Sequence, residues 1–395
     1  MKKTLCVILS VVMLVSLSAC GLFPQSTDTD KNGSAGTNTQ GNTEPHETPE
    51  EAAARAMNEC VDGYLSGMSD EEKVGQIIFA RCPESSGAAD AAEYHLGGYI
   101  LFGRDFKNKT ADEIIQTVCA YQDAAGADTG IPMLIGTDEE GGTVVRVSSN
   151  TNICGEKFFS PQALFKNGGM DKIISDAREK SRLLLALGIN VNLDPVCDVT
   201  TDSSSYMYPR TFGQDAEATS EYVSSVVGTM KSEGEGSVLK HFPGYGDNPN
   251  THTGSAVDER AMDEFESADF LPFKAGIEAG ADAVLVSHNV MTCADDKNPA
   301  SLSPAVHKIL RDELGFGGVI MTDDLVMDAV SAWSGDYPAS VQAVLAGNDM
   351  LISSDYKTQY AEVLAAAKDG TIDEAALNAA VRRVLIWKYD LGLIK

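Results

Sequence analysis

Short apolar runs alternate with longer amphipathic stretches along most of this chain. Eight runs are rich in Val, Ile, Leu, Met and Ala, and near-continuous apolar runs of this length are typical of strands buried on both faces. The predicted strands are Ile77–Ala80, Tyr99–Phe102, Met133–Thr137, Ile189–Leu193, Val238–Lys240, Ala283–Ser287, Val319–Thr322 and Met350–Ser353.

Helical periodicity fills the intervals between these strands. Ser69 followed by Asp70, Glu71 and Glu72 predicts an N-cap with an acidic first turn. The other predicted helices are Glu50–Met68, Ala111–Ala124, Asp171–Leu187, Ala216–Ser232, Ala261–Ala279, Pro304–Leu314, Pro338–Ala346, Gln359–Lys368 and Asp373–Tyr389.

This alternation predicts an α/β protein with a parallel sheet. Eight strand–helix units indicate a (β/α)₈ TIM-type barrel that forms a single catalytic domain over residues 52–395. The competing fold is an open doubly wound sheet, but no glycine-rich dinucleotide fingerprint follows any of the strands.

The first 51 residues are predicted to lie outside this domain. Lys2 and Lys3 precede a short apolar run, and Leu17-Ser18-Ala19-Cys20 follows it, so residues 1–20 resemble a lipoprotein signal peptide with lipidation at Cys20. An ordinary signal peptide is the alternative. Residues 21–51 are polar and rich in Ser, Thr, Asn and Gly, which predicts a flexible linker.

Charge and cysteine usage narrow the possible partners. The formal net charge of −28 argues against nucleic acid or an anionic membrane surface, but it is compatible with a neutral carbohydrate. With the lipoprotein signal, we expect an extracytoplasmic protein that contacts the membrane only through its N-terminal lipid, and we expect it to be a monomer. Six cysteines remain after Cys6 and Cys20; none has metal-ligand spacing, and their disulfide pairing stays open.

Polar residues follow most of the predicted strands. In a barrel, the carboxyl ends of the strands meet at one mouth, so these residues are candidates for a site that binds a polyhydroxylated ligand. They are Arg104 and Asp105, Asp138 to Gly142, Asp194 with Arg210, Lys240 with His241, His288 with Asn289, Asp323 with Asp324, and Ser353 with Ser354.

Two of these strand ends carry the strongest chemical signals. Lys240 and His241 precede a polar, glycine-bearing loop that contains His252. Asp323 follows a buried strand, where a carboxylate is costly unless it is paired or used. Beneath the anomeric carbon of a sugar, such a carboxylate serves as a nucleophile or stabilises an oxocarbenium ion.

These segments resemble glycoside hydrolase family 3, and within it the bacterial β-N-acetylglucosaminidases. The resemblance rests on five motifs that occur in the family's order and span nearly all of the chain after the linker. They are EEKVGQIIFAR at 71–81, TDEEGGTVVR at 137–146, YPRTFGQD at 208–215, KHFPGYGD at 240–247 and VIMTDDLVMDAV at 319–330.

The resemblance implies a retaining exo-β-N-acetylglucosaminidase that removes terminal β-linked GlcNAc from cell-wall fragments or related glycosides. Asp323 matches the nucleophile and His252 the acid/base, and no metal or cofactor is implied. Asn250 falls where the family has an aspartate that supports the histidine, and Asp247 or Asp258 is an alternative support. The matches to sugar contacts are Asp138, Arg210, Lys240 and His241, with Asp194 and His288 also placed in the mouth.

Two alternatives stay open on the sequence. One is a β-glucosidase or β-xylosidase of the same family. The other is a sugar-binding lipoprotein without activity, which the asparagine at position 250 favours. Binding lipoproteins have two lobes and a hinge, and the evenly spaced strand–helix units do not predict that architecture.

Overall fold

The fold was analysed in a computed structural model, which describes residues 47–246, 248, 256–331, 333 and 335–395. Within it, Pro49–Lys395 forms one compact unit. Its first helix begins at Pro49, so residues 49–51, which the sequence analysis assigned to the linker, are helical. No helix in the described part of the chain is both long and apolar enough to cross a membrane.

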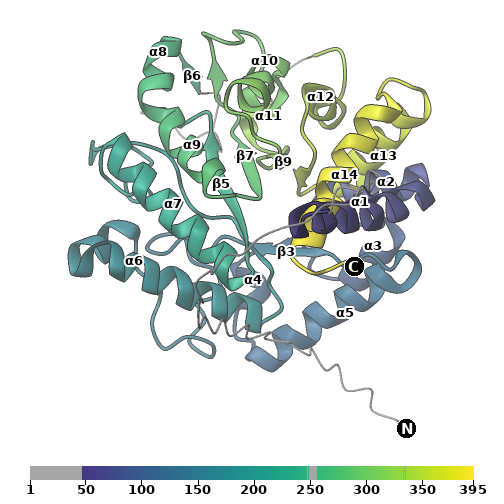
Figure 1. Cartoon of the computed structure of the whole chain (residues 1–395), viewed down its shortest axis with the longest axis horizontal. Helices are drawn as coiled ribbons and strands as arrows, with labels where there is room; N and C mark the ends of the chain where they lie inside the picture. The colour runs from purple at the N-terminus through teal and green to yellow at the C-terminus, as the bar shows by residue number, and fades with distance from the viewer. Residues whose placement is uncertain (1–46, 247, 249–255, 332, 334) are drawn as a thin grey trace, which may run out of the picture. The chain divides into compact units, whose positions relative to one another are not determined.

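Eight parallel strands form the sheet at the centre of this unit (Figure 1). Their order is β10-β1-β2-β3-β4-β5-β7-β9, and a bridge between Met321 and Met350 joins the two outer strands, so the sheet closes. The bounds are β1 Ile78–Arg81, β2 Gly98–Leu101, β3 Leu134–Thr137, β4 Val191–Asn192, β5 Gly236–Phe242, β7 Ala283–Val286, β9 Val319–Thr322 and β10 Leu351–Ser353.

The predicted (β/α)₈ barrel is therefore confirmed, and all eight predicted strands are present. Two further short strands were not predicted. They are β6 (Val257–Asp258) and β8 (Val290–Met291), which pair with each other outside the barrel sheet.

Helices surround the barrel, as Figure 1 shows. The longer ones are α1 Pro49–Gly67, α2 Asp70–Gln76, α5 Ala111–Thr129, α6 Pro161–Ala186, α7 Ala216–Glu233, α9 Phe270–Glu278, α12 Ala339–Ala346, α13 Tyr356–Lys368 and α14 Glu374–Asp390. Shorter elements are α3 Gly87–Glu93, α4 Gly103–Phe106, α8 Met262–Glu264, η1 Phe265–Asp269, η2 Ala300–Leu302, α10 Pro304–Lys308, η3 Ile309–Glu313 and α11 Asp328–Ser331.

Local chemistry explains where the helices begin. The capping box predicted before α2 is present: the Ser69 hydroxyl accepts from Glu72 N, and the Glu72 carboxylate accepts from Ser69 N. Helix α6 begins ten residues earlier than predicted. Its backbone is non-helical at Gly168 and Gly169, which interrupts the periodicity that would have revealed the first turns.

The barrel interior is filled by side chains from alternate strand positions and from α14. Phe79, Leu134 and Val238 pack there with Val384 and Trp387 of α14. Trp387 lies at the amino end of β5, where a Cβ on Gly236 would come 2.9 Å from the indole nitrogen. The interior is thus closed at the amino ends of the strands, and the site must form at the carboxyl ends.

Lys388 is a charged residue within this packing. It is fully buried on α14, and its Nζ donates to Gln76 Oε1 at 2.6 Å. Burial lowers the pKa of Lys388 to about 7, because the ammonium loses hydration and gains only a neutral amide as its partner.

We expect Lys388→Met to stabilise the protein at pH 7 by about 1–3 kcal/mol, because it removes a buried charge without a counter-ion. The unfolded chain holds this proton up to about pH 10.5, whereas the folded protein releases it near pH 7. The penalty is therefore complete below pH 7 and disappears as the pH rises toward 10.5. Urea unfolding of the variant and its parent at pH 7 and 9.5 tests this; a difference in stability that is equal at both pH values would contradict it.

Candidate active site

A pocket of about 680 Å³ lies at the carboxyl ends of the strands. Five residues that the sequence analysis assigned to the site line it together, although they are far apart in the chain: Asp138, Arg210, Lys240, His241 and Asp323. They follow or end β3, β5 and β9, or lie in the long connection after β4. The barrel topology therefore assembles most of the predicted site.

Strand β5 supplies two adjacent side chains to this pocket. Lys240 and His241 are consecutive, and the peptide bond between them is cis. The pairing of β5 with β7 also shifts register between Leu239 and Phe242. An irregularity of this kind re-aims side chains at a strand end, so both Lys240 and His241 line the pocket instead of alternating across the sheet.

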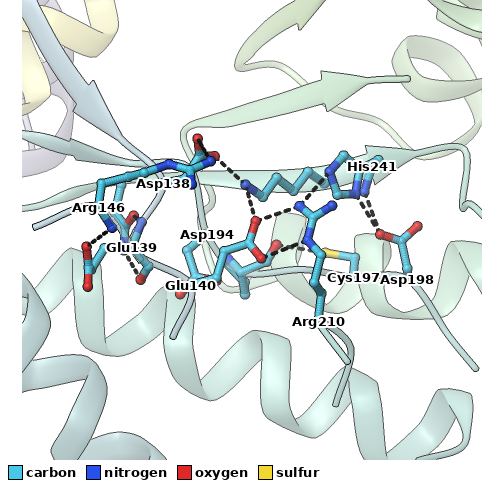
Figure 2. A network of polar contacts seen from close by, with 12 residues as sticks. Asp138, Glu139, Glu140, Arg146, Asp194, Cys197, Asp198, Arg210 and His241 are labelled. Atoms are coloured by element: carbon cyan, nitrogen blue, oxygen red, sulfur yellow. Dashed lines mark hydrogen bonds and ion pairs between the residues drawn. The ribbon is translucent and has the colours of Figure 1, made fainter. Parts of the chain in front are cut away.

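Glu140 connects the cationic residues of the pocket (Figure 2). Its carboxylate accepts two hydrogen bonds from Arg210, at 2.9 and 2.6 Å, and lies 2.7 Å from Lys240 Nζ. Burial alone would raise the pKa of Glu140, but Arg210 and Lys240 outweigh it and hold this pKa well below its usual range. Against the effect of burial, Glu140 raises the pKa of Arg210, and Asp138 together with Glu140 raises the pKa of Lys240.

Asp138 faces the pocket beside this pair. Its Oδ1 accepts from Lys240 Nζ at 2.8 Å, and its Oδ2 lies 3.5 Å from Arg146 Nη2. Arg146 reaches this position because the Glu139 carboxylate, fully buried, accepts from the backbone N–H groups of Arg146 and Val147. Neighbouring acidic residues after β3 therefore have different roles. Asp138 faces the pocket, while Glu139 stabilises the following loop through hydrogen bonds to its backbone.

Hydrogen bonds orient the imidazole ring of His241. The Asp198 carboxylate lies 2.7 Å from His241 Nδ1, which must donate to it, and also accepts from Tyr245 N at 2.7 Å. Arg210 Nη2 lies 3.2 Å from His241 Nε2, and because arginine only donates, Nε2 accepts. Asp198 therefore orients the His241 ring, and the sequence analysis did not identify Asp198.

Asp323 is placed by the turn that follows β9. Its backbone N–H donates to Val286 O at 3.0 Å, and its Oδ1 accepts from Asp324 N at 2.8 Å. The Asp324 carboxylate accepts from Ser354 N and from the Ser354 hydroxyl. Asp324 therefore ties the turn to the end of β10, while Asp323 is half-buried and lines the pocket.

Residues 69–386 match the model of the glycosyl hydrolase family 3 N-terminal domain. The chain belongs to glycoside hydrolase family 3. It is 33% identical over 298 residues to a β-hexosaminidase of Stenotrophomonas maltophilia, covering 73% of this chain and 84% of the relative. A β-hexosaminidase of Xanthomonas campestris is 31% identical over 292 residues, covering 73% of this chain and 86% of the relative.

A solved structure has the same fold. It is a family 3 β-N-acetylglucosaminidase from Paenibacillus, with a TM-score of 0.77 and 29% sequence identity. The match covers 83% of this chain but 63% of the Paenibacillus chain, so the present chain spans less than two thirds of that protein. The family resemblance and the glycoside hydrolase class predicted from the sequence are confirmed.

Asp194 of this family 3 glycoside hydrolase lies behind the pocket wall instead of lining it. It is 1% exposed, and its Oδ2 lies 3.4 Å from Lys180 Nζ on α6. Burial raises the pKa of Asp194 to about 6, although Lys180 opposes the shift. The prediction that Asp194 faces the barrel mouth is therefore corrected: its side chain points toward α6, away from the pocket.

His288 is likewise absent from the pocket lining, since it is fully buried behind the Asp323–Asp324 turn. Its Nε2 lies 3.1 Å from the carbonyl oxygen of Asp324, and its Nδ1 lies 2.7 Å from Ser301 Oγ. A carbonyl only accepts, so Nε2 carries the hydrogen. His288 thus supports the turn that carries Asp323.

The remaining predicted residues lie outside the described part of the chain. These are His252, Asn250, Cys20 and Asp247, the last of which was an alternative support for His252. Asp258, an alternative partner for His252, is described and is already engaged: it accepts from Asn248 Nδ2 and from the backbone and guanidinium of Arg260. Asp258 therefore belongs to the stem of the 249–255 segment.

The pocket can bind a neutral polyol through charged groups that are already paired. Among the described residues, no cluster of His, Cys, Asp and Glu could hold a metal ion. Lys240 and Arg210 present donors, Asp138 presents acceptors, and Asp323 lines the same pocket. In the described part of the chain, no disulfide joins the six cysteines.

We expect His288→Leu to reduce kcat for an aryl glycoside about 10-fold or more, because the Asp323–Asp324 turn loses a buried hydrogen bond and the carboxylate is displaced. KM should change less, since His288 does not line the pocket. His288→Gln retains an N–H that can donate to the Asp324 carbonyl and should recover much of the rate. Equal kcat losses in the two folded variants would show that His288 does not act through this bond.

Proposed function

We propose that this protein is a retaining exo-β-N-acetylglucosaminidase that removes terminal β-linked GlcNAc from cell-wall fragments or related glycosides. The observation that carries the proposal is the half-buried Asp323 carboxylate, which shares one pocket with Asp138, Arg210, Lys240 and His241. The names of the relatives, β-hexosaminidase and β-N-acetylglucosaminidase, support the choice of sugar.

In the proposed reaction, Asp323 attacks the anomeric carbon while the bond to the leaving oxygen breaks. The leaving oxygen takes a proton from His252, and a glycosyl–Asp323 ester forms. Neutral His252 then removes a proton from water, whose oxygen displaces Asp323 and restores the configuration. Lys240, Arg210 and Asp138 hold the sugar hydroxyls through both steps.

The residue expected to pair with His252 is an asparagine, Asn250, and not the aspartate of the family. Asn250 can hydrogen-bond an imidazole but cannot stabilise an imidazolium by charge. Asp258 is no substitute, because Arg260 and Asn248 already occupy its carboxylate. The proposal therefore includes an acid/base whose pKa lies below that of a histidine paired with aspartate.

We also propose that residues 1–20 direct export and lipidation at Cys20, and that residues 21–51 link the anchor to the barrel. The support is the sequence: two lysines, a short apolar run and Leu-Ser-Ala-Cys, followed by a polar segment. The enzyme would then be a monomer on the outer side of the cell membrane.

Asp323→Asn tests the proposed reaction. The amide cannot form the glycosyl ester, so kcat for an aryl β-GlcNAc should fall by roughly 10³-fold or more, with little change in melting temperature. Asp312→Asn is the matched control, because Asp312 is exposed and lies outside the pocket. The turnover of aryl β-glycosides of GlcNAc, glucose and xylose by the parent shows which of these sugars the enzyme prefers. Full activity of Asp323→Asn removes this residue from the mechanism, and faster turnover of glucose or xylose favours the alternative substrates.

Asn250→Asp tests the departure at the proposed acid/base. A carboxylate beside the imidazole should raise the pKa of His252 and increase kcat by about 10-fold for leaving groups that need protonation. The gain should be smaller for dinitrophenyl glycosides, whose leaving oxygen needs little protonation. A variant that shows no gain with either leaving group contradicts this role of position 250. Binding of GlcNAc by a parent that hydrolyses no glycoside would instead favour a sugar-binding protein.

A further inference from the structure

Helix α6 places a buried cation behind the wall of the active pocket. Lys180 is 5% exposed, and its ammonium has three oxygen atoms around it. Nζ donates to the backbone carbonyl oxygen of Glu140 at 3.2 Å, and it lies 3.4 Å from Asp194 Oδ2 and 3.6 Å from Asp176 Oδ2. These oxygens match the three hydrogens of the ammonium in number. Burial alone would lower the pKa of Lys180, but the two carboxylates outweigh it and raise this pKa.

The contact with Glu140 connects Lys180 to the pocket. The Glu140 carboxylate holds the two cations of the pocket, so their position depends on the backbone from which this carboxylate projects. That backbone is held on both sides: Glu140 N donates to Val144 O at 3.0 Å, and Glu140 O accepts from Lys180. Gly141 follows with a φ of 96°, and a glycine adds little stiffness of its own to the turn.

Stability alone is a poor explanation for this buried cluster. Among the described residues, Asp194 Oδ1 and Asp176 Oδ2 accept no hydrogen bond, although both atoms are buried. Burial raises the pKa values of both carboxyl groups, and Lys180 opposes that shift. Apolar side chains of similar volume are often as stabilising as a buried ion cluster, so the cluster favours a role in fixing the conformation of the site.

We propose that Lys180 is a positioning residue for the sugar site, because its ammonium fixes the carbonyl of Glu140 and thereby the carboxylate that orders Lys240 and Arg210. The inference rests on the proposed function, in which those two cations hold the hydroxyl groups of GlcNAc. Lys180 does not line the pocket, so it acts through Glu140 and not on the sugar. Its two counter-ions keep the ammonium charged and directed at the turn after β3.

Two variants separate this role from a purely structural one. The double variant Asp176→Asn/Asp194→Asn removes the counter-ions but retains the Lys180 amine, which donates to Glu140 in either protonation state. Its melting temperature should fall, while its affinity for GlcNAc should stay close to that of the parent. The triple variant, which adds Lys180→Met, removes the buried charge and should recover much of the melting temperature. Its affinity for GlcNAc, measured by calorimetry, should nevertheless fall about 10-fold.

Kinetics and hydrogen exchange provide two further measurements. With an aryl β-GlcNAc, the triple variant should raise KM about 10-fold and change kcat less, because the contacts to the sugar hydroxyls act in the ground state and the transition state alike. The backbone amides of residues 138–146 should exchange faster in the triple than in the double variant, because the turn has lost its donor. The exchange measurement needs no sugar, so it is independent of the proposed function.

Lys166→Met is the matched control. Lys166 is also on α6, but it is exposed and does not line the pocket. Its replacement should leave the GlcNAc affinity, KM and the exchange of residues 138–146 unchanged.

Two outcomes would overturn the inference. Equal GlcNAc affinity in the double and triple variants, or equal exchange of residues 138–146, shows that Lys180 does not position the site. Affinities that follow the melting temperature across the variants assign Lys180 to stability alone. A parent that neither binds GlcNAc nor hydrolyses its aryl β-glycoside refutes the proposed function instead, and hydrogen exchange then decides whether Lys180 holds the turn.

Discussion

The active pocket depends on one buried carboxylate, Glu140. Lys240 is fully buried and Arg210 is partly buried beside it, and two adjacent cations in such a place would repel each other. Glu140 stabilises both by lying between them, and its own charge is held by the same contacts. The donors that face a sugar are therefore fixed before any sugar arrives, which reduces the entropy and reorganisation that binding would otherwise cost.

A second layer of side chains fixes the groups that Glu140 does not reach. Asp198 sets the tautomer of His241, and His288 holds the carbonyl of the turn that carries Asp323. Both supporting residues are buried: Asp198 lies in the connection after β4, and His288 lies just after β7. Lys240, His241 and Asp323 thus lie at or directly after the ends of barrel strands, where the backbone is fixed by the sheet.

The strands and the pocket-facing residues were predictable from the sequence. The hydrophobic pattern of a strand and the position of a residue at the end of that strand are both local properties of the sequence. The supporting residues were not predictable. Glu140 follows Asp138 and Glu139 in an acidic run, and nothing in the run distinguishes the residue that faces the pocket from the one that folds the loop. Asp194 shows the same limit. It lies two residues after β4, but its carboxylate faces Lys180, a buried cation on α6, and not the pocket. Strand-end position predicts the level of a residue along the barrel axis but not its direction.

Charge explains how so acidic a protein can maintain a cationic pocket. Two cations, Lys240 and Arg210, are neutralised by Glu140 and Asp138, so they can serve a neutral sugar without attracting every anion in solution. Arg81 is different, since it is held by the Phe102 ring and not by an acid. A ring stabilises a cation without neutralising it, so the positive charge remains available to a ligand. The pocket therefore combines two kinds of basic residue: Lys240 and Arg210 are paired with acids, and Arg81 is stacked on an aromatic ring.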